Sequence, residues 1–289
     1  MLTSRFNTLV SLLSAAVLCL SCSTYEETTG TEGFVVEGWI DSGRFPEVKV
    51  TRTLSLYTGG MSVDSLDKCI ERWARVAVCD GERTVVLTGK PDRNRFPPYI
   101  YTTGEMRGEA GKTYTLTVET SDGQHAEAVT TIPEPVLLDS FSVERVAGND
   151  TLCQLYGYTR NRSKCKLFTR VVGLDGEYKS SYLGLYDVGM IGEDGKVTIS
   201  RGRTNLKKNF TPFFSSGDTV LVKFSAIDSV AFRFWRGFED MVSLSRNPLF
   251  PVTKNLQTNM KGALGYWFGY GSSFYSVRLR DYLDKHSDR

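Results

Sequence analysis

Few side chains in this sequence have the types and spacing that catalysis needs. Ser65 and Lys68 have the S-x-x-K spacing, in which a lysine activates a serine nucleophile, but the S-D-N and K-T-G elements that accompany it are absent. Glu239 and Asp240 are adjacent, and on a helix they would point about 100° apart, so they cannot form an acid–base pair by themselves. The chain has two histidines. The sequence therefore predicts a protein that is not an enzyme and needs no metal or cofactor.

The thiol of Cys22 is the best candidate for a chemical modification. Residues 9–20 form an apolar run that follows Arg5. This run is shorter than the roughly 20 residues that span a bilayer, and it fits the apolar part of a secretory signal peptide. The small Ser21 before Cys22 resembles the bacterial lipobox, whose cysteine is acylated and becomes the first mature residue. An ordinary cleaved signal peptide is the alternative.

The sequence after Cys22 predicts how the protein is attached. Residues 1–21 are the expected lipoprotein signal peptide, and residues 22–33 form a polar tether between the lipid and the folded body. Glu26 and Glu27 resemble the acidic surface-export signal of lipoproteins in the Bacteroidota, although a solvated acidic linker has the same composition. We expect a protein that is lipid-anchored to the outer membrane and exposed at the cell surface.

Four further cysteines lie in the body of the protein, at Cys69, Cys79, Cys153 and Cys165. Outside the cytoplasm an even number of cysteines favours disulfide bonds. The simplest of the three possible connectivities is Cys69–Cys79 with Cys153–Cys165, and free buried thiols are the alternative. The spacing matches no zinc motif.

Composition predicts a folded protein of two domains. The chain has 289 residues, of which 40% are hydrophobic and 24% charged, and domains usually contain about 100–200 residues. The 35 lysines and arginines nearly balance the 33 aspartates and glutamates. This balance argues against a nucleic-acid-binding protein, which needs a concentrated basic face.

Short segments of period-two hydrophobicity predict an N-terminal β-sandwich of immunoglobulin or transthyretin type over residues 34–134. Asp80-Gly81 and Asp122-Gly123 predict tight hairpins. Pro133 and Pro135 remove backbone donors and predict a stiff connection at the domain boundary. The expected strands cover residues 34–40, 48–53, 74–79, 84–87, 99–102, 113–118 and 125–131.

Residues 135–283 are predicted to form a β-rich α+β domain, followed by a polar tail at residues 284–289. The domain has strand-like segments at residues 138–146, 152–159, 166–172 and 218–225, and Asp194-Gly195 predicts a further hairpin. One amphipathic helix begins after a cap at Asp228 or Ser229 and ends at Asn247-Pro248. Its apolar stripe, which predicts core packing, consists of Ala231, Phe234, Trp235, Phe238, Met241 and Val242.

Residues 259–275 interleave glycines with aromatic residues and form the most unusual stretch of the sequence. Aromatic faces can stack on sugars or other flat ligands, and glycines permit close approach of the backbone. The alternative is a bulged central strand whose rings fill the core. The candidate ligand-binding or partner-binding residues are Tyr266, Trp267, Phe268, Tyr270, Phe274 and Tyr275.

Three motifs, taken in order, resemble the lipoproteins of the Bacteroidota grouped as domain-of-unknown-function family 4249. They are V-V-E-G-W-I at residues 35–40, G-K-T-Y-T-L-T-V followed by A-x-T-x-I-P-x-P at residues 111–135, and T-N-M-K-G-A-L-G-Y-W-F-G-Y at residues 258–270. The resemblance implies an outer-membrane lipoprotein encoded beside TonB-dependent transporters, and it supplies no catalytic residues.

The leading hypothesis is therefore a non-enzymatic cell-surface lipoprotein that assists nutrient binding or uptake by a TonB-dependent outer-membrane transporter. Its expected partners are the outer membrane, a transporter and a nutrient that the sequence does not identify, and nucleic acid is not among them. A structural or adhesive surface module is the second hypothesis, and a hydrolase of surface polymers is the third.

Overall fold

A single long strand, β16 (Leu264–Arg278), runs through the middle of an eight-stranded sheet. The computed structural model describes residues 33–53, 69–187, 189–202, 210–244, 256 and 258–283. The strand order in the sheet is β12-β11-β15-β16-β1-β2-β6-β5. The other seven strands are β1 (Phe34–Asp41), β2 (Glu47–Arg52), β5 (Thr88–Pro91), β6 (Tyr99–Thr102), β11 (Cys165–Val171), β12 (Lys179–Tyr186) and β15 (Thr219–Ala226).

Two four-stranded sheets pack against the two halves of this long sheet. The first has the order β4-β3-β7-β8, and in the second β10 pairs with β9, β13 and β14. Each half is therefore a β-sandwich with its own apolar core. The strands of the smaller sheets are β3 (Arg75–Cys79), β4 (Thr84–Val86), β7 (Thr113–Glu119), β8 (His125–Thr131), β9 (Ser140–Val146), β10 (Asn149–Tyr158), β13 (Lys196–Ile199) and β14 (Phe214–Ser215).

The predicted fold class, mainly β with an N-terminal sandwich followed by a β-rich α+β half, is confirmed. Gly81 and Gly123 adopt positive φ in the hairpins between β3 and β4 and between β7 and β8, as the sequence predicts. The predicted hairpin at Asp194-Gly195 is wrong. Gly195 does form a turn, but β12 and β13 on either side of it belong to different sheets.

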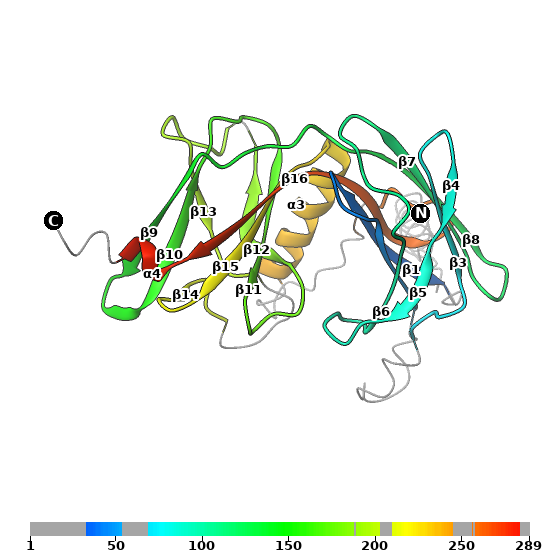
Figure 1. Ribbon diagram of the computed structural model, residues 1–289, viewed down its shortest axis with the longest axis horizontal. Helices are drawn as coiled ribbons and strands as arrows, with labels where there is room; N and C mark the ends of the chain where they lie inside the picture. Colours follow the sequence, from blue (N-terminus) through cyan, green and yellow to red (C-terminus); the bar gives the residue numbers. More distant parts are fainter. Residues whose placement is uncertain are drawn as a thin grey trace, which may run out of the picture. The chain divides into compact units, whose positions relative to one another are not determined.

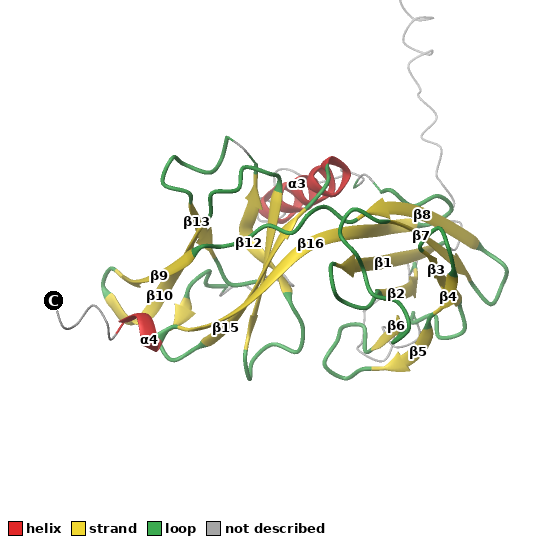
Figure 2. Cartoon of the chain, turned by 45° about the horizontal axis from the view of Figure 1, so that its top comes forward, coloured by secondary structure: helices red, strands yellow, loops and turns green. Residues whose placement is uncertain are grey.

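The predicted amphipathic helix is α3 (Ser229–Leu244). Asp228 caps it, because its carboxylate accepts a hydrogen bond of 2.7 Å from the backbone N–H of Ala231. Figure 2 shows α3 beside β12 and β16. A second helix, α4 (Arg280–Leu283), follows β16. The expected stop at Asn247-Pro248 and the tail at residues 284–289 lie outside the described residues, and neither described helix is long and apolar enough to cross a membrane.

Strand β16 crosses the boundary that the sequence predicts near residue 134, as its orange-to-red ribbon in Figure 1 shows. Its first part, residues 264–270, pairs in parallel with β1, and its second part, residues 271–278, pairs antiparallel with β15. Trp267 accordingly belongs to the core of the first sandwich and Val277 to the core of the second. The division at residue 134 stays a prediction, and one strand contributes to the cores on both sides of it.

The proline-rich connector crosses directly over β16, and two glycines make room for it. A Cβ atom at Gly269 would lie 2.8 Å from the carbonyl oxygen of Thr131, and one at Gly271 would lie 2.3 Å from that of Pro133. Both distances are far below van der Waals contact, and the obstructing atoms are backbone atoms. Glycine is therefore required by close backbone approach at these two positions.

This crossing predicts that Gly271→Ala destabilises the protein. Overpacking of this kind costs about 1–3 kcal/mol, which for a protein of this size lowers the melting temperature by roughly 2–12 °C. Thermal unfolding followed by circular dichroism measures the effect. Gly104→Ala is the matched control, because a Cβ atom at Gly104 would have no neighbour within 4 Å. A Gly271→Ala protein as stable as the control variant would contradict the prediction.

Candidate functional site

The six aromatic residues predicted as a binding surface are divided between the two faces of β16. Trp267 is fully buried in the first core, where its indole N–H donates a hydrogen bond of 3.1 Å to the carbonyl of Tyr114. Tyr275 packs on the second core, and its hydroxyl accepts a hydrogen bond of 2.7 Å from the backbone N–H of Leu138. These two rings therefore face away from the other four.

Tyr266, Phe268, Tyr270 and Phe274 lie on the opposite face of the sheet, which we call the outer face. Phe268 and Tyr270 are buried there, while Tyr266 and Phe274 are half-buried. Tyr266 stacks on Phe268 with ring centroids 4.8 Å apart, and α3 covers Tyr266, Phe268 and Tyr270. Phe274 instead packs against Tyr178. The rings of Trp267, Phe268 and Tyr270 are buried in apolar cores. For these three residues the second interpretation of residues 259–275, a central strand whose rings fill the core, is therefore correct.

Helix α3 closes the outer face with its predicted apolar stripe. Phe234 contacts Phe268 at a centroid distance of 5.3 Å, and Trp235 contacts Phe168 of β11 at 5.5 Å. The indole N–H of Trp235 donates a hydrogen bond of 3.1 Å to the hydroxyl of Tyr270. Burial raises the pKa of the Tyr270 hydroxyl well above its ordinary value, so this hydroxyl stays protonated.

Two buried lysines lie among these rings, and each has a carboxylate partner. Lys223 of β15 contacts Asp41 of β1, with Nζ 2.6 Å from Oδ1, and Ser272 of β16 donates a hydrogen bond to the same carboxylate. Lys166 of β11 contacts Glu239 of α3 at 2.6 Å. Desolvation lowers the pKa of Lys166, and the neighbouring Glu239 carboxylate opposes this shift. Both ion pairs connect separate elements of the fold.

A third ionic group joins the two halves of the chain at the Glu47 end of β2. Glu177 lies 2.9 Å from the Nζ of Lys49 and 3.5 Å from a guanidinium nitrogen of Arg95, which also contacts Glu47 at 2.7 Å. Burial raises the pKa of Glu47, and Arg95 opposes the shift. The carboxylates of Asp41, Glu47 and Glu177 are thus each paired with lysine or arginine.

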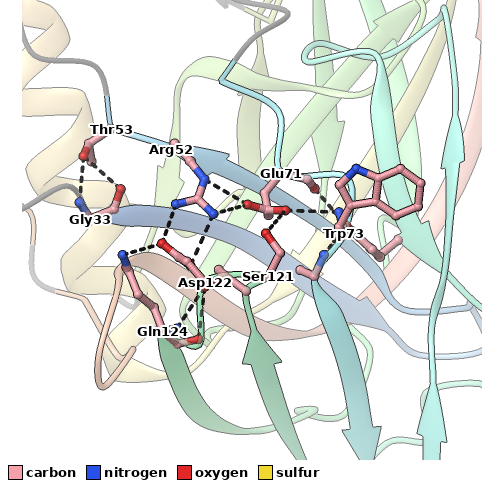
Figure 3. Close-up of polar contacts among 11 residues, drawn as sticks. Gly33, Arg52, Thr53, Glu71, Trp73, Ser121, Asp122 and Gln124 are labelled. Atoms are coloured by element: carbon pink, nitrogen blue, oxygen red, sulfur yellow. Dashed lines mark hydrogen bonds and ion pairs between the residues drawn. The ribbon is translucent and has the colours of Figure 1, made fainter.

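A polar network at the other end of β2 fixes the point where the chain enters the folded body. Gly33 and Thr53 exchange backbone and side-chain hydrogen bonds of 2.9–3.1 Å. Arg52 donates to both Glu71 and Asp122, as Figure 3 shows. Hydrogen bonds from Arg52 and Thr120 hold the pKa of Asp122 well below its ordinary range. We call Gly33, Arg52, Thr53, Glu71 and Asp122 the entry network.

Trp73 extends from the entry network into solvent. Its side chain is 82% exposed, the largest exposed fraction among the large hydrophobic residues that the structure describes. Its backbone is fixed, because the buried Glu71 carboxylate accepts a hydrogen bond of 3.1 Å from the Trp73 N–H (Figure 3). Trp73 is not among the residues that the sequence predicts as a functional site. The only sequence signal for its exposure is the charged segment E-R-W-A-R at residues 71–75. This segment does not alternate between apolar and polar residues as a strand with one buried face does.

The predicted disulfide bonds are a correction, because Cys79, Cys153 and Cys165 carry free thiols. In each predicted pair the two cysteines belong to different sheets. Cys69 pairs with β2 through the N–H of Arg52 while Cys79 ends β3, and Cys153 lies in β10 while Cys165 lies in β11. The Cys165 thiol instead donates a hydrogen bond of 3.2 Å to the carbonyl of Ser163, and the Cys79 sulfur accepts one of 3.4 Å from the N–H of Gly81. Burial raises the pKa of Cys165 to about 12.

Among the described residues, no group of three histidine, cysteine, aspartate or glutamate side chains is arranged to hold a metal ion. Cys22, Glu26 and Glu27, on which the predicted anchor and export signal depend, lie outside the described residues.

Comparison with known proteins gives one clear relationship. The family model "Domain of unknown function (DUF4249)" matches residues 23–275. No curated protein matches the sequence. Among solved structures, the crystal structure of the FN1–FN3 domains of chicken CNTN1 matches with 11% sequence identity and a TM-score of 0.24. That match covers 86% of this chain and 66% of the other, so this chain spans just under two thirds of that relative's length.

The burial of Trp267 predicts a large loss of stability in Trp267→Ala. Truncation of a buried tryptophan costs about 3–5 kcal/mol, and the hydrogen bond to Tyr114 is lost as well. Chemical denaturation measures the free energy of unfolding. Trp73→Ala is the matched control, because an exposed ring contributes little to the folded state. Equal stabilities of the two variants would show that the assignment of Trp267 to the core is wrong.

The cysteine environments predict an order of reactivity. The thiolate is the reacting form, so buried Cys165 stays unmodified by iodoacetamide at neutral pH in the folded protein, while half-buried Cys79 reacts first. Mass spectrometry of peptides after timed labelling measures both rates, and labelling in denaturant equalises them. Rapid labelling of Cys165 in the folded protein, or a Cys153–Cys165 disulfide in unreduced peptides, would contradict the structure.

Proposed function

The chain belongs to the DUF4249 family, and on this premise we propose that it is a non-enzymatic outer-membrane lipoprotein that assists nutrient binding or uptake by a TonB-dependent transporter. Cys22 carries the lipid, residues 22–33 form the tether, and the remaining chain is presented at the cell surface. The transporter supplies the passage through the membrane, and this protein supplies a body that contacts the transporter or its nutrient.

One observation carries this proposal, namely that the two halves of the body are locked to each other. Strand β16 pairs with both β1 and β15, and the Lys223–Asp41 and Lys49–Glu177 ion pairs also connect the two halves. A stiff body of this kind suits a protein that positions a partner or a nutrient, because a fixed geometry reduces the entropy lost on binding.

The ionisable groups support a binding role over a hydrolytic one. The hydrolase hypothesis requires two carboxyl groups that face each other across a bound glycosidic bond, one of them available as an acid. Three outer-face carboxylates, Asp41, Glu47 and Glu177, are instead directed at Lys223, Arg95 and Lys49. Burial raises the pKa of a fourth, Glu37, but the other three are ion-paired and do not supply the second free carboxylate. Surface-polymer hydrolysis therefore ranks third.

The edges of the eight-stranded sheet bear on the adhesive hypothesis. An adhesive module that adds strands from other chains needs a long and regular edge. Here one edge strand, β5, has four residues and ends at Pro91. The other, β12, is interrupted at Leu183, whose φ is 52°. Short and irregular edges oppose strand addition to this sheet, so the adhesive role ranks second.

The anchoring part of the proposal is tested with Cys22→Ser. We expect the wild-type protein to carry fatty acyl chains and to fractionate with the outer membrane, whereas the variant loses both properties. Mass spectrometry of the N-terminal peptide and fractionation of cells measure the two effects. Cys79→Ser is the matched control, because it removes a thiol of the body and leaves Cys22 intact. Unchanged acylation and membrane retention in Cys22→Ser would contradict the proposal.

The partnership is tested separately by chemical crosslinking of the wild-type protein in intact cells, followed by affinity purification from solubilised membranes. A TonB-dependent transporter crosslinked to the wild-type protein, and absent with Cys22→Ser, is the expected result. Purification of the anchored protein without any transporter would contradict the role as a transporter accessory while leaving the anchor intact.

A further inference from the structure

We infer that Trp73, with the neighbouring Arg72 and Arg75, is a membrane-contact site that seats the body on lipid headgroups beside the point where the tether enters. This inference rests on the proposed lipid anchor. It adds a second contact with the bilayer, made by the folded body itself, and it assigns an orientation to the anchored protein.

The first observation is that Trp73 is both exposed and held in place. Its ring is 82% exposed, yet its backbone N–H binds the Glu71 carboxylate, which is itself buried and bound by Arg52. The backbone of the next residue, Ala74, donates a hydrogen bond of 3.1 Å to the hydroxyl of Tyr101. The exposure of the ring therefore belongs to a fixed loop conformation.

The second observation is the position of Trp73 relative to the tether. Gly33, the last tether residue, pairs with Thr53 next to Arg52, and residues 69–71 pair with β2 on its other side. Two strand spacings of about 4.8 Å each therefore separate the start of β1 from the segment that leads into Trp73. The entry network links the two directly through Arg52 and Glu71 (Figure 3).

The third observation is the length of chain between the lipid and the body. Ten residues lie between Cys22 and Gly33, and a chain of that length spans at most about 40 Å. The tether thus holds the Gly33 end of the first sandwich close to the bilayer. Residues 69–71 run antiparallel to β2 from the level of Arg52 to that of Val50, and Trp73 follows them. Trp73 therefore meets the headgroups when this part of the first sandwich approaches the bilayer.

The chemistry of the site fits a lipid surface better than a protein partner. Tryptophan favours the membrane–water interface, where its ring contacts acyl chains and its N–H stays hydrated. Arg72 and Arg75 are exposed on either side of it, and cations there attract anionic headgroups. A stable protein interface needs about 800 Å² on each partner, whereas this site presents a single projecting ring.

The test uses the full lipidated protein reconstituted in phosphatidylcholine vesicles, with and without phosphatidylglycerol, that carry bromine at chosen depths of the acyl chain. Trp73→Phe removes the exposed tryptophan, so the difference between wild-type and variant fluorescence reports on Trp73. We expect a blue-shifted difference spectrum that shallow bromines quench more than deep ones. Trp73→Ala should also lower, by severalfold, the fraction of molecules whose Gly33 end is protected from added protease.

The matched control is Phe96→Ala. Phe96 is also an exposed aromatic residue, at 62%, but its backbone carbonyl accepts a hydrogen bond from Lys49, toward the Glu47 end of β2. The adjacent residue, Arg95, contacts Glu47 at 2.7 Å, at the end of β2 opposite Arg52. Because β2 spans about 17 Å, Phe96 lies away from the entry network. Phe96→Ala should leave both the Trp73 quenching and the protease protection unchanged, and an effect equal to that of Trp73→Ala would overturn the assignment of the site.

Failure of this inference and failure of the proposed anchor give different results. A wild-type protein that sediments with the vesicles, but whose Trp73 fluorescence is unaffected by bromine, would overturn the membrane-contact site and leave the anchor standing. A protein that does not sediment with the vesicles would overturn the anchor. A photoreactive amino acid at position 73 that crosslinks in cells to a protein, and not to lipid, would also overturn the membrane-contact site.

Discussion

The structure depends on one constraint, which is that the single strand β16 has to complete the sheets of two sandwiches and also form the surface on which α3 packs. Alternate residues of a strand face opposite sides of the sheet. In β16 one set therefore supplies Trp267 and Val277 to the two cores, while the other set supplies Tyr266, Phe268 and Tyr270 to the surface under α3. A shift of register by one residue would exchange the two sets and bury the wrong side chains everywhere at once. The glycines in the middle of the strand lie where the connector crosses it.

The buried ion pairs are best understood as part of the same constraint. A buried pair adds little net stability, because desolvation offsets the attraction, but removal of one partner leaves a charge that costs about 3–5 kcal/mol. Asp41 and Lys223 are 182 residues apart in the sequence and meet only when β1 and β15 lie on either side of β16. The Lys166–Glu239 pair fixes α3 on β11 in the same way. These pairs penalise alternative arrangements of the halves more than they stabilise the native one.

The sequence predicted local structure well and the connections between distant segments poorly. Period-two segments located most strands, and the cap at Asp228 with the apolar stripe located α3, because these signals are contained within a few residues. Nothing in residues 259–278 indicates that one strand pairs with both β1 and β15. The predicted disulfide bonds failed for the same reason, since assigning one pair of cysteines to each domain says nothing about which thiols the fold brings together. The aromatic residues of the 259–275 segment were predicted as binding residues. Their burial depends on the pairing of β16 with distant strands, which the sequence does not indicate.

Trp73 and Trp267 show why composition alone could not locate a functional surface. Both are tryptophans. The glycine-rich sequence around Trp267 led to its prediction as a binding residue, whereas the charged sequence around Trp73 led to no such prediction. Yet the glycines around Trp267 serve backbone packing, and the charges around Trp73 fix a loop that keeps its ring in solvent. Folding covers an aromatic residue wherever neighbouring elements can close over it, as α3 does on the outer face. An aromatic ring that remains exposed on a fixed backbone is therefore the more informative one, because burial would have been favourable and the entry network prevents it.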